Sequence, residues 1–450
     1  MLFFVRCYSN AQELDLIYGE NMKRFAIDLP HGEALNGADA GQQRLLSLKK
    51  RRKLWLSVHL WLGLLLGFFL AVFGITGSIL VFYEEIDNVV NADLRIVQAP
   101  AQGEPAYRSL DEIQAVAVAA MPPQAKLNFV DYPADAKTSY KFGFVIPIAV
   151  ADEKDEWQVF VNPYTAQVLG KHLIKKAEDI LPSALIPFVF RLHFALLSGE
   201  TGVIIVGIIG VVLLFSVFTG LIVWWPLTGN WRRVLSLKAK ASVERFNHDL
   251  HQTSGFYTFP ILLAVLLSGV YMNLPDQFMA LVKQLSPGTQ GFMDNPHSLA
   301  AAGKKPIDLT QALSIVQSHY PEGRVDWLSL PDGETGIYRI SISDVPRLSR
   351  FWSERQVSVD QYNGTILKVQ DPSTRSTAGQ TFVEWQWPLH SGKAFGWTGR
   401  ILVFLSGLAC PVLFITGLIR WLQKRRAKSK TSGKAESLKG AFTFNKPNNL

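Results

Sequence analysis

The sequence is poor in cysteine and in charge. Its 450 residues include two cysteines, Cys7 and Cys410, and 18% charged side chains. Cys7 lies in a polar N-terminal stretch and Cys410 lies within an apolar run, so they support neither a disulfide framework nor a cysteine-based metal site. The polar segments also lack the spacing of a nucleophilic triad and of a phosphate-binding loop. Neither a hydrolase nor a nucleotide-dependent enzyme is therefore indicated.

Long apolar runs are the main feature that is present. Four of them reach the roughly 20 residues that a helix needs to cross a bilayer. They cover about 54–83, 203–225, 256–274 and 401–422. The third run is the shortest and contains Pro260, which predicts a kink that neighbouring helices accommodate. A mean hydropathy of +0.14 is too low for a chain buried in lipid throughout, so large aqueous segments are expected as well.

Lysine and arginine predict the orientation of these runs. Basic clusters occur at 49–53, 232–245 and 420–430. The positive-inside rule assigns these clusters, and with them both termini, to the cytoplasm. We therefore expect a multi-pass protein of the bacterial inner (cytoplasmic) membrane, with the segments after the first and third runs exported. The formal net charge of +8 then reflects topology, and no nucleic-acid partner is expected.

These boundaries divide the chain into successive segments. They are a cytoplasmic extension (1–48), the first membrane helix (49–83), an exported module (84–192), the second membrane helix (193–225), a cytoplasmic loop (226–247), the third membrane helix (248–274), a second exported module (275–389), the fourth membrane helix (390–422) and a cytoplasmic tail (423–450). The first residues form too short an apolar stretch for a signal peptide. The tail after residue 426 is rich in Lys, Ser, Gly and Asn and is expected to lack regular structure.

One pattern of residues occurs twice along the chain. His193 leads into an apolar run that ends in Thr219-Gly220, and His390 leads, 197 positions later, into a run with Thr416-Gly417. A second set of matches has an offset of 192: His59 with His251, Gly63 with Gly255, and Gly77 with Gly269. Fixed offsets over such distances indicate an internal duplication. The duplicated unit is a helix, an aqueous segment and a second helix, and each helix carries one histidine near one end.

The two exported segments share a pattern of their own. Residues 111–120 and 308–316 have helical spacing, whereas 157–170 and 355–367 alternate apolar and polar residues around a turn. The sequence therefore predicts a small helix-plus-antiparallel-sheet module in each segment. A structural or binding role is favoured for these modules over catalysis. The predicted fold class is a mainly α membrane protein, a four-helix transmembrane bundle from two tandem repeats with two extracytoplasmic α+β modules.

Several of these motifs resemble the PepSY-associated transmembrane family. His59-x-x-x-Gly63 and Thr76-Gly77 are similar to its first helix, Asp249-Leu250-His251 to its third, and Leu389-His390 to the entry of its fourth. The exported strand-turn-strand pieces resemble PepSY modules, and the resemblance covers about residues 50–425. It implies a relationship to iron-regulated inner-membrane proteins and to ferric-siderophore reductases that carry two b-type haems.

Four histidines occupy corresponding places in the duplicated unit. His59 and His251 stand near the cytoplasmic ends of the first and third helices, and His193 and His390 precede the second and fourth on the exported side. An ionisable side chain at the end of a membrane helix is costly unless it has a partner or a role. A neutral imidazole is a good ligand for haem iron, and helix bundles often build such sites. We interpret the four as two bis-histidine haem b sites, His59 with His251 and His193 with His390. Capped interfacial histidines are the alternative.

Further residues are weaker candidates around these sites. His248 shares a helix face with His251 and is a second candidate for the ligand, a propionate contact or a helix cap, although only His251 matches His59 in the repeat. Arg191 and Arg400 are candidates for propionate pairing. The remaining histidines lie in aqueous segments without a repeat partner and are assigned no site: His31, His172, His297 and His319.

The spacing of histidines and glycines supports two separate levels in the membrane. From His59 to Gly77 a helix rises about 27 Å, at roughly 1.5 Å per residue. Gly77 is therefore level with His193 and His390, and the same argument places Gly220 and Gly417 level with His59 and His251. Small residues opposite a flat macrocycle and plain helix packing explain these glycines equally well.

The sequence therefore predicts a di-haem b electron-transfer protein of the inner membrane. By resemblance, it reduces a ferric siderophore or another small periplasmic acceptor, with electrons from a cytoplasmic donor or from quinone. The alternative is a non-enzymatic PepSY membrane protein that binds peptides or regulates an extracytoplasmic protease, and a transporter subunit is a third hypothesis. The absorption spectrum of the protein separates the first hypothesis from the other two, because only haem would colour it.

Overall fold

The computed structural model describes residues 37–443, except 149–153, 180, 227–228, 230, 239, 292–295, 302, 346–353 and 372–376. Two compact units divide the chain at Leu54 and Trp55. In the first unit, the described residues begin helix α1 (Gly37–Val81), which continues into the second. All further elements belong to the unit Trp55–Leu450. Cys7 and His31 lie outside the described residues, and so does the prediction that His31 has no site.

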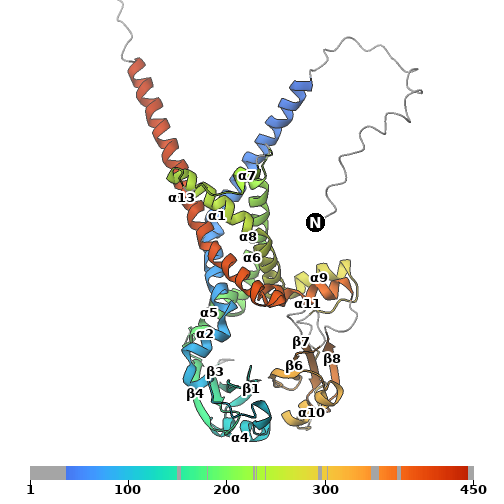
Figure 1. Cartoon of the computed structure of the whole chain (residues 1–450). Helices are drawn as coiled ribbons and strands as arrows, with labels where there is room; N and C mark the ends of the chain where they lie inside the picture. The colour runs from blue at the N-terminus through green and yellow to red at the C-terminus, as the bar shows by residue number, and fades with distance from the viewer. Residues whose placement is uncertain are drawn as a thin grey trace, which may run out of the picture. The chain divides into compact units, whose positions relative to one another are not determined.

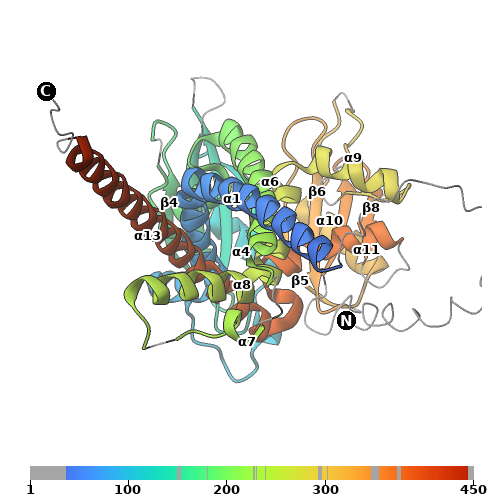
Figure 2. The ribbon, with the colours of Figure 1, turned by 90° about the horizontal axis from the view of Figure 1, so that it is seen from above.

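In the part of the chain that the structure describes, four helices are long and apolar enough to cross a membrane, as predicted. Their spans are Leu46–Val81 in α1, Gly199–Trp224 (α6), Val243–Asn273 (α8) and Lys393–Ala427, most of it in α13 (Gly396–Thr443). Figures 1 and 2 show this bundle from two directions. Large apolar side chains on its outside, such as Leu65 and Phe68, are exposed, as a surface in contact with lipid requires.

Small residues let two of these helices approach closely. A Cβ atom on Gly74 of α1 would lie 2.4 Å from the carbonyl oxygen of Gly407 in α13. Four residues further along α1, the hydroxyl of Ser78 donates a hydrogen bond of 2.8 Å to the carbonyl of Phe404. Close backbone contact through small residues is the usual way in which membrane helices associate, because lipid provides no hydrophobic driving force between them.

The helices of the second and fourth spans begin after His193 and His390, which lie outside them. His193 lies on a separate short helix, α5 (Leu185–Ala195), and His390 ends another, α12 (Gln386–His390). Leu196, Leu197 and Gly199 adopt positive φ between α5 and α6. Gly392 and Gly396 do the same around the turn η2 (Lys393–Phe395). Left-handed backbone cannot continue an α-helix, so each histidine-bearing segment turns away from the helix that follows it.

The C-terminal tail also differs from the expectation. It was predicted to lack regular structure, but α13 remains helical through Thr443. Lys and Ala are good helix formers and follow directly on a formed helix, so propagation needs no new nucleus.

The two segments between the membrane spans, 84–192 and 275–389, form one antiparallel sheet rather than two separate ones. Its strand order is β4-β3-β2-β1-β5-β6-β7-β8. The strands are β1 (Lys126–Asp131), β2 (Tyr140–Pro147), β3 (Lys154–Val161), β4 (Val168–Lys175), β5 (Arg324–Ser329), β6 (Ile337–Ser343), β7 (Glu354–Asp360) and β8 (Ile366–Gln370). The two segments, predicted as two modules, join where β1 pairs with β5. The open edge of a four-stranded sheet exposes unpaired backbone groups, and this pairing satisfies them.

Two helices cover one face of this sheet. They are α4 (Leu110–Ala119) and α10 (Leu309–His319), the segments with predicted helical spacing. Ser109 caps the first, and Asp308 forms a capping box with Gln311 at the start of the second. Beneath them lies a core of side chains from both segments, including Phe142, Val159, Leu328, Ile340 and Val357.

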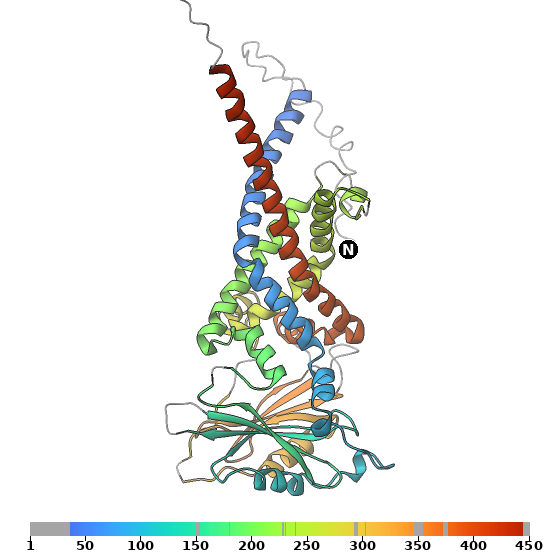
Figure 3. The ribbon, with the colours of Figure 1, turned by 90° about the vertical axis from the view of Figure 1, so that its left-hand side faces the viewer.

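The other face of the sheet is turned toward the helix bundle (Figure 3). We call it the bundle-facing face, and its side chains alternate along each strand with those of the core. Short elements lie between sheet and bundle or connect the long helices. They are α2 (Tyr83–Val90), α3 (Ala92–Arg95), η1 (Glu104–Ala106), α7 (Trp231–Val234), α9 (Pro275–Leu285) and α11 (Ala378–Glu384).

Candidate functional site: two histidine pairs in the bundle

The structure brings His59 of α1 and His251 of α8 together. Their ring centroids lie 6.3 Å apart, with 66° between the ring planes. We call them the far pair, because they lie toward the end of the bundle away from the sheet. An imidazole nitrogen binds a metal at roughly 2 Å, so this separation accommodates one metal ion on the line between the two rings.

A second pair repeats this geometry nearer to the sheet. His193 of α5 and His390 of α12 have ring centroids 6.1 Å apart and ring planes at 69°. We call them the sheet-side pair. Both pairs are those that the sequence offsets match, and each joins one histidine from either half of the chain. Thus two nearly identical arrangements stand one above the other in the bundle.

A buried hydroxyl from another helix holds the Nδ1 atom of every ring. Each hydroxyl already donates its own hydrogen to a backbone carbonyl one turn earlier, for example Thr76 to Val72 at 2.7 Å, so toward the ring it can only accept. The ring–hydroxyl distances are 3.0 Å for His59 with Thr219, 2.9 Å for His251 with Thr416, 2.9 Å for His193 with Thr76 and 2.9 Å for His390 with Ser268.

These contacts determine the tautomer of the histidines. His59 Nδ1 also lies 3.1 Å from the carbonyl of Ser216, and His390 Nδ1 lies 3.0 Å from that of Val265. A carbonyl oxygen only accepts, so Nδ1 carries the proton and Nε2 keeps its lone pair. A metal-binding histidine is usually oriented in this way, by an acceptor at the nitrogen that does not bind the metal.

A glycine follows each of the four hydroxyl residues and makes room for the ring. A Cβ atom would lie 3.0 Å from His59 Cε1 at Gly220 and 3.1 Å from His193 Cε1 at Gly77. The corresponding distances are 3.4 Å at Gly417 and 3.5 Å at Gly269. The sequence placed these glycines at the correct levels and left their role open. In the structure they lie against the imidazoles.

The sheet-side pair is kept neutral by its surroundings. Burial lowers the pKa of His193 to about 3, and the neighbouring His390 adds to the effect. Burial likewise lowers the pKa of His390 to about 4. Both rings are therefore neutral at physiological pH, which is the protonation state that binds a metal.

The weaker candidates from the sequence have other partners. His248 lies 3.4 Å from Asp249 and lines an open cavity of about 360 Å³ with Ser242, Glu244, Arg245 and Arg420. Arg400 binds Glu85 at 2.7 Å. Arg191 donates to both carboxylate oxygens of Glu156, at 2.7 and 2.6 Å. Two of the histidines without an assigned site lie on β4 (His172) and α10 (His319), and neither belongs to a pair.

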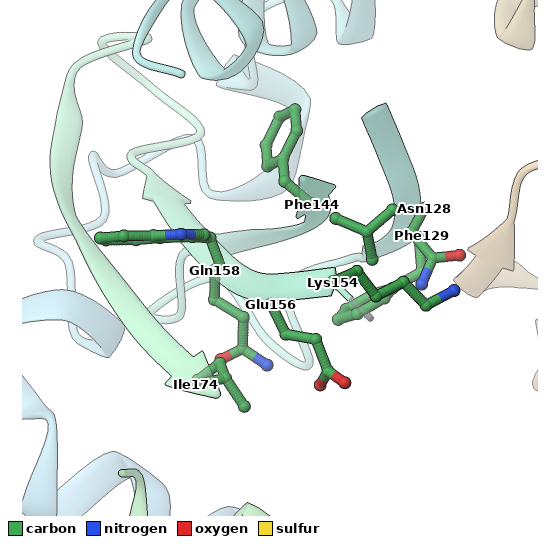
Figure 4. Close-up of a pocket in the computed structure, with 9 residues that line it drawn as sticks. Asn128, Phe129, Phe144, Lys154, Glu156, Gln158 and Ile174 are labelled. Carbon is green, nitrogen blue, oxygen red and sulfur yellow. The ribbon is translucent and has the colours of Figure 1, made fainter. Parts of the chain in front are cut away.

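The Arg191–Glu156 pair joins the sheet to the helix that carries a site histidine. Arg191 stands two residues before His193 on α5, and Glu156 lies on β3. Glu156 also lines a cavity of about 170 Å³ with Lys154 and Gln158. Figure 4 shows Glu156 and Gln158 on one side of the sheet and Phe144 on the other. The position of the sheet is thereby coupled to the sheet-side pair.

Sequence reasoning missed the hydroxyl partners. Thr76, Thr219 and Thr416, each followed by glycine, were visible as part of the repeated pattern, with Ser268-Gly269 as the fourth example. The signal was the presence of a Thr or Ser before every one of these glycines. Within the described part of the chain, no three or more His, Cys, Asp and Glu side chains gather as a metal-binding group, so the pairs are the best-formed ligand sets.

Fold and site together define a membrane protein with four spans and two histidine pairs inside its helix bundle. The sequence matches the family model described as the PepSY-associated TM region over residues 56–424, and the chain belongs to this family. No curated protein matches the chain.

Proposed function

We propose that this protein is an inner-membrane electron-transfer protein that binds two b-type haems and reduces a ferric siderophore on the exported side. The observation that carries the proposal is the geometry of the two pairs, with centroids 6.3 and 6.1 Å apart. Bis-histidine ligation requires two neutral rings whose Nε2 atoms face one iron. Haem bound by each pair would supply a one-electron carrier at that level of the membrane.

The surroundings of each pair fit such a group. A hydroxyl from a neighbouring helix holds the Nδ1 atom of each of the four rings. The glycine that follows each hydroxyl residue lets the ring lie close to that helix. Helix α1 carries His59 at one level and contacts His193 through Gly77 at the other. His59 and Gly77 are about 27 Å apart at roughly 1.5 Å per residue. This separation is close to the roughly 30 Å hydrocarbon thickness of a bilayer. Two carriers at these levels would connect the two sides of the membrane.

The expected topology sets the direction of the reaction. Basic residues cluster at 49–53, 232–245 and 420–430, and by the positive-inside rule this supports a cytoplasmic far pair and an exported sheet. A cytoplasmic donor or quinone would then deliver electrons at the far pair. The ferric siderophore would accept them near the sheet-side pair, and reduction to Fe(II) weakens its binding to oxygen ligands. The protein needs no general acid or nucleophile for this transfer.

An absorption spectrum tests the proposal. The purified chain should show a Soret band, a reduced α-band after dithionite, and two haems per chain by pyridine haemochrome assay. His251→Ala and His390→Ala should each lose one haem. His172→Ala, which alters a histidine on the sheet, should retain both and serves as the control. A colourless protein, or unchanged haem content in both site variants, would contradict the proposal.

The edges of the sheet favour a second candidate function. β4 and β8 are its terminal strands, and an exposed edge strand can bind an extended peptide by main-chain hydrogen bonds. A non-enzymatic protein that binds peptides or regulates an extracytoplasmic protease would use these edges. It would be colourless, so the same spectrum distinguishes the two functions.

A further inference from the structure

The two halves of the sheet have matching register, which allows their bundle-facing residues to be compared one by one. Lys141 of β2 lies opposite Asp131 of β1. In the other half, Arg339 of β6 lies opposite Ser329 of β5. Lys141 and Arg339 therefore occupy the same position in their respective halves, but the residue opposite is an acid in one and a hydroxyl in the other.

Arg339 therefore has no carboxylate opposite it on β5. Lys141 forms an ion pair with Asp131. Arg339 has no ion pair with any residue that the structure describes, and its Nε atom is buried without a hydrogen-bond partner. Burial lowers the pKa of its guanidinium. A partly desolvated, unpaired guanidinium costs free energy, and an anion that binds to it would recover this free energy.

A second pair of corresponding residues shows the same contrast. Glu156 of β3 lies opposite Val145, and Glu354 of β7 lies opposite Ser343, at the matching position. Glu156 is neutralised by Arg191, two residues before His193. Two residues before His390 stands Pro388, which has no charge to offer.

Glu354 accordingly has no ion pair in the described part of the chain. It accepts hydrogen bonds from the Ser341 hydroxyl at 2.8 Å and from the Gln356 amide at 3.2 Å. Burial, and then the nearby Asp326, raise the pKa of its carboxyl. Lys393 is the cation that acts on it from the bundle, and its ammonium is already bound to Glu84 at 3.1 Å.

The neighbours of Arg339 suit an anionic oxygen ligand. The register places it in one row across the sheet with Ser329, Ser358 and Lys368. The next residue in this row is Phe129 of β1, a half-buried aromatic ring. Two cations, two hydroxyls and an aromatic ring match the carboxylate, hydroxamate or catecholate oxygens of an iron chelate.

We propose that the β5–β8 half of the bundle-facing face is a binding site for an anionic iron chelate, with Arg339 as its principal anchor. In the β1–β4 half, Lys141 and Glu156 are already neutralised by ion pairs, and the Glu156–Arg191 pair connects the sheet to α5. The identity of the ligand as an iron chelate rests on the proposed function, whereas the anion site itself does not. The site lies on the side of the sheet that faces the sheet-side histidine pair.

Binding of radioiron chelates to the full chain in detergent tests the site without depending on haem. Fe(III)-EDTA and ferric citrate serve as anionic probes, and ferrioxamine B, whose free ammonium makes the complex cationic, serves as the contrast. The wild type should bind the anionic probes more tightly than ferrioxamine B. Arg339→Gln should weaken anionic binding by at least about tenfold, because it removes a charge-assisted contact, and should leave ferrioxamine B unaffected.

Two further variants make the test specific. Lys141→Gln removes the corresponding cation of the first half and should leave binding unchanged. Ser329→Asp gives Arg339 the partner that Lys141 has, so it should weaken anionic binding as strongly as Arg339→Gln while the thermal unfolding temperature stays the same or rises. The proposal is overturned if the wild type binds neither anionic probe, or if Arg339→Gln and Ser329→Asp bind both as the wild type does. A colourless protein that passes this test would overturn the haem proposal alone.

Discussion

His193 and Thr76, on α5 and α1, are joined by a hydrogen bond of 2.9 Å in which the ring nitrogen Nδ1 donates to the hydroxyl. The same relationship holds at the other three histidines. It leaves the Nε2 lone pair of every ring free to bind a metal. Four predictions follow from this arrangement and from the charges around it.

Removing the hydroxyl of Thr76 should loosen the sheet-side site. Thr76→Val keeps the shape of the side chain but leaves the Nδ1–H of His193 without an acceptor. Loss of such an outer partner typically costs 10–100-fold in metal affinity, so we expect a loss of about this size in haem affinity at one of the two sites. Haem titration of the apoprotein measures it. Ser406→Ala, which removes a buried hydroxyl bonded to Val403, is the control; equal losses in both variants would refute a role for the Nδ1 contact.

A methyl group at Gly220 should disturb the far pair. Gly220→Ala places a Cβ atom 3.0 Å from His59 Cε1, so the ring must move by a few tenths of an ångström. We expect a shifted or weakened haem spectrum from one site, with the other unchanged. The matched control is Gly63→Ala, whose Cβ meets nothing within 4 Å and which should be neutral or stabilise the helix by up to about 1 kcal/mol. Identical spectra for the two variants would count against the packing role of Gly220.

The Arg191–Glu156 pair should contribute to stability. A hydrogen-bonded ion pair contributes about 1.5–3 kcal/mol when buried. Its side chains here are 29% and 30% exposed, so we expect a coupling energy of about 1 kcal/mol after solvent screening. A double-mutant cycle with Arg191→Gln and Glu156→Gln, followed by thermal unfolding, measures this energy. The exposed Lys176–Glu178 pair should show no measurable coupling energy. A coupling energy as large as that of Arg191–Glu156 would contradict the idea that the Arg191–Glu156 pair contributes more to stability than an ordinary surface pair.

Glu354 should make stability depend on pH. Its pKa in the folded protein is raised above the ordinary value of 4.5 by burial and by Asp326, while Ser341, Gln356 and Lys393 act in the opposite direction. The folded state therefore holds the proton more tightly than the unfolded state. The contribution of Glu354 protonation to the free energy of unfolding is greatest at low pH. It is lost as the pH rises from about 4.5 through the raised pKa.

Glu354→Gln mimics the protonated carboxyl and removes this dependence. The variant should unfold at a higher temperature than the wild type at neutral pH and should match it more closely at acidic pH. Glu156→Gln, at the corresponding position in the other half, should destabilise instead, because it breaks an ion pair. Thermal scans across the pH range check both signs. A Glu354→Gln variant that is less stable than the wild type at neutral pH would contradict the assignment.

Much of the architecture could be read from local patterns in the sequence. The four candidate spans follow from the length of apolar runs, and the helices α4 and α10 follow from their helical spacing. The offsets that matched His59 with His251 and His193 with His390 also predicted which rings face each other. These features depend on residues close together in the chain or on simple counting, so sequence alone carries them.

Other features depend on contacts between distant residues. The break between α5 and α6 arises from the left-handed backbone of Leu196 and Leu197, for which a leucine-rich run gives no signal. The joining of β1 to β5 places residues about 200 positions apart side by side, and hydropathy does not encode register between segments. Arg191, a candidate for pairing with a haem propionate, forms an ion pair with Glu156, because folding brings a carboxylate of the sheet to it.

The sequence by itself indicated four candidate membrane spans, each with one histidine in it or just before it. Periodicity, charge bias and repeat offsets are properties of the chain before it folds. The tertiary structure alone decided that a hydroxyl and a glycine from a neighbouring helix hold each imidazole. It also decided that, among the residues that the structure describes, Arg339 and Glu354 have no ion-pair partners such as Lys141 and Glu156 have. Such differences arise only when strands and helices from distant parts of the chain meet, because a charge is paired or unpaired according to what lies next to it in space.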